Sequence, residues 1–143
     1  MNHKPKIFLF IIFASLFFAG FIFMSLQETP KKYNLVITKV KNDWKVADET
    51  DYTKTRISVK KKEVIIWTAK GTDAYLQFPA KLFNAVDAED SLKNGYTKFL
   101  KDGKKLKLKV KDDALAGTYE YAVFCTKDGV YATGDSPPRI VIQ

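Results

Sequence analysis

Few residues of this chain could hold a metal ion or attack a substrate. There is one cysteine, Cys125, and one histidine, His3. The chain has two methionines, Met1 and Met24, and like His3 they are remote from Cys125 in sequence. A single thiol also excludes an intrachain disulfide and a two-cysteine zinc site. The sequence therefore predicts no cofactor and a buried Cys125 thiol, the alternative being an exposed thiol that pairs between chains.

Catalytic groups of other kinds are equally scarce. With no histidine beyond His3, the Ser-His and Cys-His arrangements of nucleophilic catalysis are excluded. Asp112-Asp113 and Glu89-Asp90 are adjacent carboxylates, which point to opposite faces of a strand or into solvent. No glycine-rich phosphate-binding loop is present. These absences predict that the protein is not an enzyme.

A run of alternating lysines is the strongest candidate for a binding surface. In residues 105–111, Leu106, Leu108 and Val110 alternate with four lysines. Because successive side chains of a strand point to opposite faces, we expect the apolar residues to enter the core and the lysines to form a row on the other face. The row is a candidate contact for an anionic surface, and its members are Lys105, Lys107, Lys109 and Lys111. The alternative is an edge strand whose lysines prevent sheet-to-sheet aggregation.

The N-terminal part of the chain has the composition of a membrane anchor. Residues 7–26 are twenty residues without a charge, enough for a helix to span about 30 Å of hydrocarbon. The stretch is longer than the apolar region of a signal peptide and lacks a small-residue cleavage site at its end. We therefore expect residues 1–6 to be a basic tail, 7–26 an uncleaved transmembrane signal anchor and 27–32 a linker, with a cleaved signal peptide as the alternative.

The charges of the chain bear on its partners and on the orientation of the predicted anchor in the membrane. The net charge is +8, and residues 27–143 carry 22 basic and 16 acidic side chains. Such an excess favours anionic partners or simply keeps a small domain soluble, and we expect no nucleic-acid partner. The short basic tail before the hydrophobic run predicts a single-pass protein of the cytoplasmic membrane. Its C-terminal domain would be extracytoplasmic, either periplasmic or on the cell surface.

The elements that would position these residues are mostly strands. Residues 84–94 could form no more than one or two helical turns. Frequent turn signals between the strands indicate an all-β sandwich with antiparallel strands over residues 33–143. A continuous β-branched run predicts a central strand at 63–68. Period-two patterns and turn signals predict further strands at 33–40, 56–60, 75–78, 105–111, 118–125 and 139–142.

The order of these segments resembles the cupredoxin-like fold. Residues 62–68, a glycine-containing turn and residues 75–78 look like its middle strands, and the stretch from Gly117 to Cys125 looks like its penultimate strand, which ends in a copper-ligating cysteine. Cys125 lies two residues further from the glycine than in typical members. The resemblance implies a Greek-key β-sandwich. Its other ligands are missing, because neither residues 73–75 nor residues 126–134 contain histidine or methionine.

These observations together favour a membrane-anchored binding or scaffolding domain without a metal or catalytic site of its own. Its partner would be a membrane protein or an anionic surface. The alternative is an accessory subunit of a membrane redox or transport complex whose cofactor lies in a partner.

Overall fold

The computed structural model describes residues 28–143. Residues 1–27 lie outside the described residues, and the predicted basic tail and transmembrane segment lie there with them. Within the described part of the chain, no helix is long and apolar enough to span a membrane.

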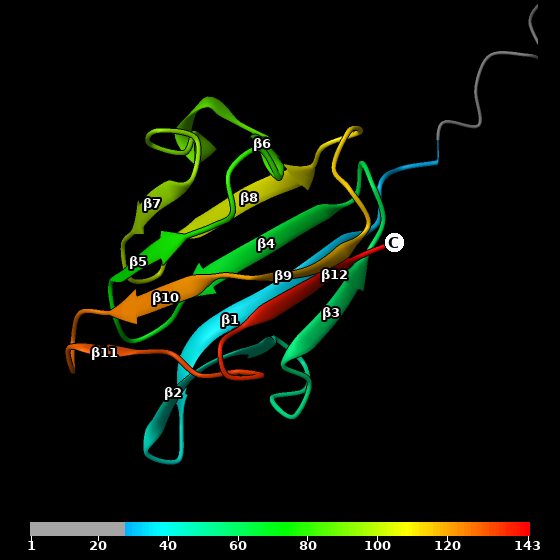
Figure 1. Cartoon of the computed structure of the whole chain (residues 1–143). Coiled ribbons are helices and arrows are strands. Elements are labelled where there is room, and N and C mark those ends of the chain that lie inside the picture. Colours follow the sequence, from blue (N-terminus) through cyan, green and yellow to red (C-terminus); the bar gives the residue numbers. More distant parts are fainter. Residues whose placement is uncertain (1–27) are drawn as a thin grey trace, which may run out of the picture.

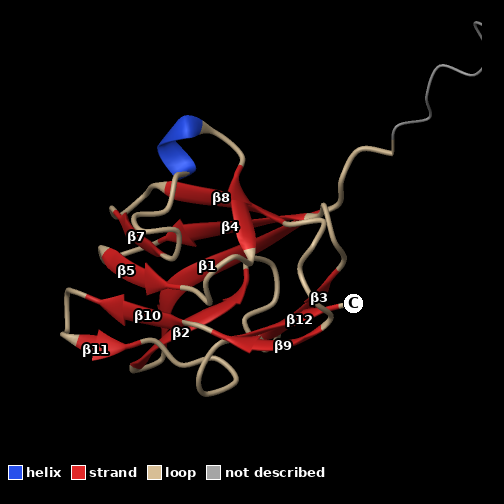
Figure 2. Ribbon diagram, turned by 45° about the horizontal axis from the view of Figure 1, so that its top comes forward, coloured by secondary structure: helices blue, strands red, loops and turns tan. Residues whose placement is uncertain are grey.

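The described chain is built almost entirely of short strands. A single turn of 3-10 helix, η1 (Ala88–Asp90), is the helical element among the described residues (Figure 2). The prediction of at most one or two helical turns in residues 84–94 is thus confirmed. In chain order the strands are β1 (Lys32–Val40), β2 (Asp43–Asp48), β3 (Arg56–Val59), β4 (Val64–Ala69), β5 (Ala74–Gln77), β6 (Phe83–Ala85), β7 (Thr97–Leu100), β8 (Lys105–Val110), β9 (Gly117–Glu120), β10 (Ala122–Cys125), β11 (Val130–Tyr131) and β12 (Arg139–Ile142).

The strands form two layers that pack face to face (Figure 1). One layer is a sheet of order β2-β1-β4-β8-β6. The other consists of two smaller sheets, β11-β10-β5-β7 and β3-β12-β9, which run into each other because only Tyr121 separates β9 from β10. The chain crosses between the layers several times, from β3 to β4, from β4 to β5 and from β7 to β8. The all-β Greek-key sandwich predicted from the sequence is confirmed.

Two strand pairs correct the expectation of a purely antiparallel sandwich. β1 runs parallel to β4, with Leu35 opposite Trp67, and β12 runs parallel to β3, with Ile140 opposite Ile57. Alternation of apolar residues defines the buried face of a strand but not the direction of its neighbour. The expectation was therefore wrong at the two places where a crossover returns the chain in the same direction.

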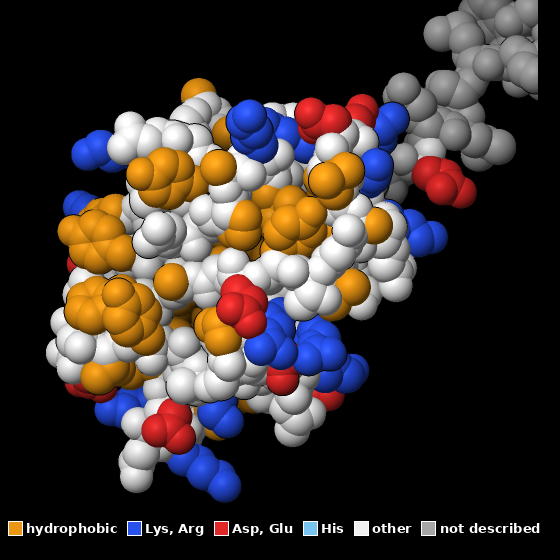
Figure 3. Space-filling view, in the orientation of Figure 1, with side chains coloured by type: hydrophobic (Ala, Val, Ile, Leu, Met, Phe, Trp, Pro, Cys, Tyr) orange, Lys and Arg blue, Asp and Glu red, His pale blue; other side chains and the backbone are white. Residues whose placement is uncertain are grey.

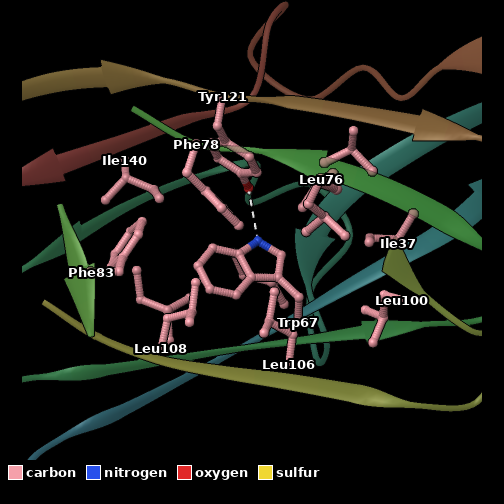
Figure 4. Close-up of a cluster of buried hydrophobic side chains, with 14 of the residues drawn as sticks. Ile37, Trp67, Leu76, Phe78, Phe83, Leu100, Leu106, Leu108, Tyr121 and Ile140 are labelled. Carbon is pink, nitrogen blue, oxygen red and sulfur yellow. Dashed lines mark hydrogen bonds between the residues drawn. The ribbon is translucent and has the colours of Figure 1, made fainter. Parts of the chain in front are cut away.

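The core between the layers is centred on an aromatic cluster (Figure 4). Trp67 of β4 is fully buried and its ring lies 5.0 Å from that of Phe78 and 5.9 Å from those of Phe83 and Tyr121. The Trp67 indole N–H donates a hydrogen bond of 3.2 Å to the Tyr121 hydroxyl. Aliphatic side chains from both layers surround the cluster, among them Ile37, Leu76, Leu106, Leu108 and Ile140.

Candidate binding surface

Four aromatic side chains form a line across the outer face of the sheet β11-β10-β5-β7. Phe124 of β10 lies opposite Tyr131 of β11 on one side and opposite Tyr75 of β5 on the other, and Tyr75 lies opposite Phe99 of β7. Neighbouring strands are about 4.8 Å apart, so the line extends over roughly 15 Å. We call these four residues the aromatic row.

The rings of the aromatic row contact each other in two pairs and remain accessible to solvent. Tyr75 and Phe99 have ring centroids 4.7 Å apart, and Phe124 and Tyr131 have centroids 5.2 Å apart. Tyr131, Tyr75 and Phe99 are 67%, 55% and 41% exposed, whereas Phe124 is half-buried. Figure 3 shows hydrophobic side chains gathered on the part of this face where Figure 1 places β5, β7, β10 and β11.

The aromatic row faces outward because the alternate residues of the same strands fill the core. Ala74, Leu76, Leu100, Val123 and Cys125 are 3% exposed or less. The rings are therefore not part of the folding core, and their exposure leaves apolar surface in contact with water. Contiguous apolar patches of this kind on a soluble domain mark binding sites.

Two hollows lie beside the aromatic row, both on the side where Gln77 lies opposite Ala122 and Thr97. The first, of about 380 Å³, is lined by Tyr75 and Phe99 together with Ser91, Lys93, Thr97 and Lys98. The second, of about 410 Å³, is lined by Gln77, Phe78, Pro79, Glu120, Tyr121, Ala122 and Pro137. The ring planes meet at 44° and 68°, so the row is an uneven surface and not a flat stacking platform.

The predicted lysine row lies along β8, as expected, and a further strand covers only the C-terminal half of β8. Leu106, Leu108 and Val110 are fully buried, which confirms the predicted alternation. β8 pairs with β4 along its length and with β6 at its C-terminal end. β6 covers residues 108–110, so the edge-protection interpretation does not hold for that half of β8. Residues 105–107 have no strand beyond them within residues 28–143.

The lysine row is also divided by its partners. The Lys107 Nζ lies 2.8 Å from an Asp87 carboxylate oxygen, and this hydrogen bond raises the pKa of Lys107. The buried Asp90 carboxylate accepts a hydrogen bond from the Lys107 backbone N–H and so fixes η1 beside β8. Lys105 and Lys109 are exposed at opposite ends of the strand, and Lys111 lies beyond it. The contact of all four lysines with an anionic surface stays a prediction. The ion pair with Asp87 argues against a part for Lys107 in it.

Cys125 lies at the C-terminal end of β10 with its side chain in the core. The residue is fully buried and opposite Ala74 of β5. Burial, and then the negative charge of Asp128, raise the pKa of the thiol to about 11. A neutral, buried thiol is neither a nucleophile nor a ready metal ligand.

The cupredoxin-like resemblance associates residues 73–75 and 126–134 with metal ligands, and the starts of these two segments lie side by side. The Thr126 backbone N–H donates to the Asp73 carbonyl at 3.0 Å. The Asp73 carboxylate instead accepts the Asp102 backbone N–H at 2.8 Å and so holds a loop. Within residues 28–143, no three residues of the types His, Cys, Asp and Glu are grouped so as to bind a metal ion.

Comparison with known proteins bears on the fold alone. No family model and no curated protein matches the chain. Solved structures of amicyanin are similar to it. A copper(I) form of one amicyanin variant is 15% identical, covering 78% of this chain and 82% of its own, with a TM-score of 0.42. A second copper(I) variant is 16% identical, covering 81% and 87%, with a TM-score of 0.43. The fold described here rests on the strand order and register of this chain.

Sequence reasoning missed the aromatic row. The sequence shows four separate aromatic residues. Only the pairing of four strands brings these residues into one line. The β7 segment lacks polar–apolar alternation and the β11 segment has only two residues, so Phe99 and Tyr131 were not assigned to predicted strands.

Proposed function

We propose that this protein is a membrane-anchored, extracytoplasmic binding domain that holds a partner protein at the aromatic row. Residues 7–26 would be the anchor, and the domain would have no metal or catalytic site of its own. The observation that carries the proposal is the alignment, on one sheet face, of two contacting pairs of aromatic rings, three of the four rings being exposed.

Several properties of the aromatic row favour a protein partner. Tyrosine is enriched in interface hot spots, where a few aromatic anchors supply most of the binding energy. The uneven ring planes and the hollows beside the row offer positions for interdigitating side chains, and polar residues such as Gln77 and Thr97 line these hollows. Four partly exposed rings cover less than the roughly 800 Å² per partner of a standard stable interface. The row therefore suits the centre of a larger interface or a transient one.

The scarcity of reactive groups supports a binding role over catalysis. The one histidine of the sequence is His3, and the one thiol is buried. The accessory-subunit alternative places the cofactor in a partner. A metal or haem that copurifies with the full chain in stoichiometric amount would favour that alternative.

The proposal is tested by cross-linking the full-length protein in intact membranes. Replacing Tyr75 and Tyr131 by Ser removes two exposed rings of the aromatic row without opening the core, so we expect the cross-linked partner to be lost. Tyr52→Ser is the matched control, because Tyr52 is 41% exposed and lies outside the row. Equal cross-linking of the double variant and the control would contradict the proposed surface.

The anchor is tested separately by washing membranes with carbonate. Twenty uncharged residues suffice to span a bilayer, so we expect the full chain to stay in the pellet. A mature chain that begins between residues 20 and 30 would show that the segment is cleaved.

A further inference from the structure

The end of the sandwich at which residue 28 enters the fold carries a concentration of lysines. β1 begins there, and the β3–β4 turn and the C-terminal end of β8 lie beside it, because Lys32 lies opposite Val64 and Val64 lies opposite Lys109 (Figure 1). The Lys62 backbone N–H bonds to Val110, and the Lys111 N–H bonds to Leu82. We call the following eight lysines the basic end: Lys31, Lys32, Lys60, Lys61, Lys62, Lys81, Lys109 and Lys111.

The carboxylates at this end do not balance the eight lysines. They belong to Glu28, Glu63, Asp112 and Asp113. Glu63 is held within the domain, where it accepts hydrogen bonds from the Tyr33 hydroxyl at 2.8 Å and the Lys60 backbone N–H at 2.7 Å. Asp112 lies 3.6 Å from the Lys62 Nζ, with both side chains well exposed. Surface pairs of this kind are weak, so most of the positive excess of the domain faces solvent at this end.

The basic end is also the part of the domain nearest to the predicted anchor. A hollow of about 400 Å³ is lined by Lys62 and Lys109 and by residues 28–30 of the linker. The uncharged stretch ends at Leu26, and an extended chain spans at most about 3.6 Å per residue. The start of β1 at Lys32 therefore lies no more than roughly 20 Å along the chain from the end of that stretch.

We propose that the basic end docks on the anionic phospholipid headgroups around the anchor, which orients the domain on the membrane. The inference rests on the proposed anchoring. Attraction to an anionic bilayer falls off within a screening length of about 8 Å, so only the lysines nearest the surface contribute. The strands that carry the aromatic row lie at the opposite end of the sandwich (Figures 1 and 2). Docking thus presents the row away from the lipid.

Energy transfer from the native tryptophans tests this orientation. The full-length chain is reconstituted into phosphatidylcholine vesicles with or without phosphatidylglycerol, each containing a headgroup-labelled dansyl lipid. Trp44 and Trp67, the two tryptophans of the chain, are the donors. With phosphatidylglycerol we expect transfer to rise roughly twofold at low salt and to return to the phosphatidylcholine value at high salt, because salt screens the attraction.

Two charge-matched variants identify the lysines involved. The first variant should abolish the increase in energy transfer that phosphatidylglycerol causes. It combines Lys60→Gln, Lys61→Gln, Lys62→Gln and Lys109→Gln. The control combines Lys101→Gln, Lys104→Gln, Lys105→Gln and Lys127→Gln, which removes the same charge away from the basic end and should leave the rise intact. An unchanged tryptophan emission maximum verifies that each variant is folded. Equal loss in both variants, or no rise in the wild type, would overturn the inference.

Carbonate extraction of the same vesicles separates this inference from the anchoring proposal. A chain that is extracted refutes the anchor. A chain that remains in the pellet but transfers energy equally from both lipid mixtures is anchored and not docked.

Discussion

Among single residues, the buried pair Trp67 and Tyr121 links the two layers of the sandwich. The indole N–H and the hydroxyl are both inside the core and satisfy each other at 3.2 Å (Figure 4). Burial raises the pKa of the Tyr121 phenol far above its ordinary value, so the group stays neutral across the physiological range. The pair therefore adds a direction-dependent contact to an otherwise apolar cluster.

Replacing Tyr121 by Phe should lower the free energy of unfolding by about 1–3 kcal/mol, because the Trp67 N–H is left buried without an acceptor. The measurement is urea denaturation followed by tryptophan fluorescence. Tyr131→Phe, which removes a hydroxyl from a ring that is 67% exposed, is the control and should be nearly neutral. If both variants lose the same stability, the hydrogen bond contributes nothing specific.

The Cys125 thiol should react slowly in the native state. Its side chain is fully buried and its pKa is raised to about 11, and the thiolate is the reactive form. At pH 8 we expect an aromatic disulfide reagent to label the thiol rapidly in urea and at least about tenfold more slowly without it. Rapid native labelling, or a disulfide dimer on a non-reducing gel, would show an exposed thiol instead.

Among the elements, η1 is held against β8 by one buried carboxylate. Asp90 is 1% exposed and accepts hydrogen bonds from the backbone N–H groups of Asp87, at 3.1 Å, and Lys107, at 3.0 Å. The Lys107 N–H lies on the edge of β8, one residue before the pairing with β6 begins at Leu108. A side chain thus continues the backbone ladder where the neighbouring strand has ended.

Asp90→Ala should destabilise the domain by about 1–3 kcal/mol, since two backbone N–H groups lose a charged acceptor. Amide hydrogen exchange should also accelerate at Lys107 before it does in β4. Glu89→Ala, at the exposed neighbouring position, should leave both stability and exchange unchanged. Unaltered exchange at Lys107 in Asp90→Ala would mean that the carboxylate does not protect this edge.

The elements also show which parts of the fold could be predicted from sequence. β1, β3, β4, β5, β8 and β12 have apolar residues at alternate positions or β-branched runs, and each was predicted within a few residues. β6, β7 and β11 were not, because they have 3, 4 and 2 residues and become strands through pairing. β2 was also missed, although Trp44 and Val46 alternate with charged residues in it. The predicted strand 118–125 is interrupted at Tyr121, whose backbone N–H bonds to Pro138 instead of continuing the ladder. Strand pairing is a long-range property, and so is the aromatic row that depends on it.

In the molecule as a whole, Asp128 joins segments that are distant in sequence. One of its carboxylate oxygens lies 2.7 Å from the Lys39 Nζ of β1 and 2.7 Å from the Trp44 indole nitrogen of β2. The turn between β10 and β11 is thereby fastened to the β1–β2 hairpin across the two layers. These hydrogen bonds, that of Lys39 first, lower the pKa of Asp128.

Asp48 and Asp51 have lowered pKa values for a local reason, because each accepts hydrogen bonds from a threonine two residues later in the β2–β3 loop. A carboxyl group whose pKa is lower in the folded than in the unfolded state stabilises the fold above its unfolded pKa. That stabilisation is lost as the pH falls through the folded value. The domain should therefore keep its stability near neutral pH and lose it progressively below about pH 4, the ordinary range of aspartate.

Asp128→Asn should reduce this acid sensitivity, because an amide has no proton to take up. We expect a lower Tm than the wild type at pH 7, where the ion pair with Lys39 is missing, and a smaller decrease in Tm between pH 6 and pH 3. Thermal unfolding followed by circular dichroism at a series of pH values measures both effects. Asp113→Asn is the matched control, since the Asp113 carboxylate makes no ion pair within residues 28–143. Parallel Tm profiles for Asp128→Asn and the wild type would show that the contact between the turn and the hairpin does not depend on the charge of Asp128.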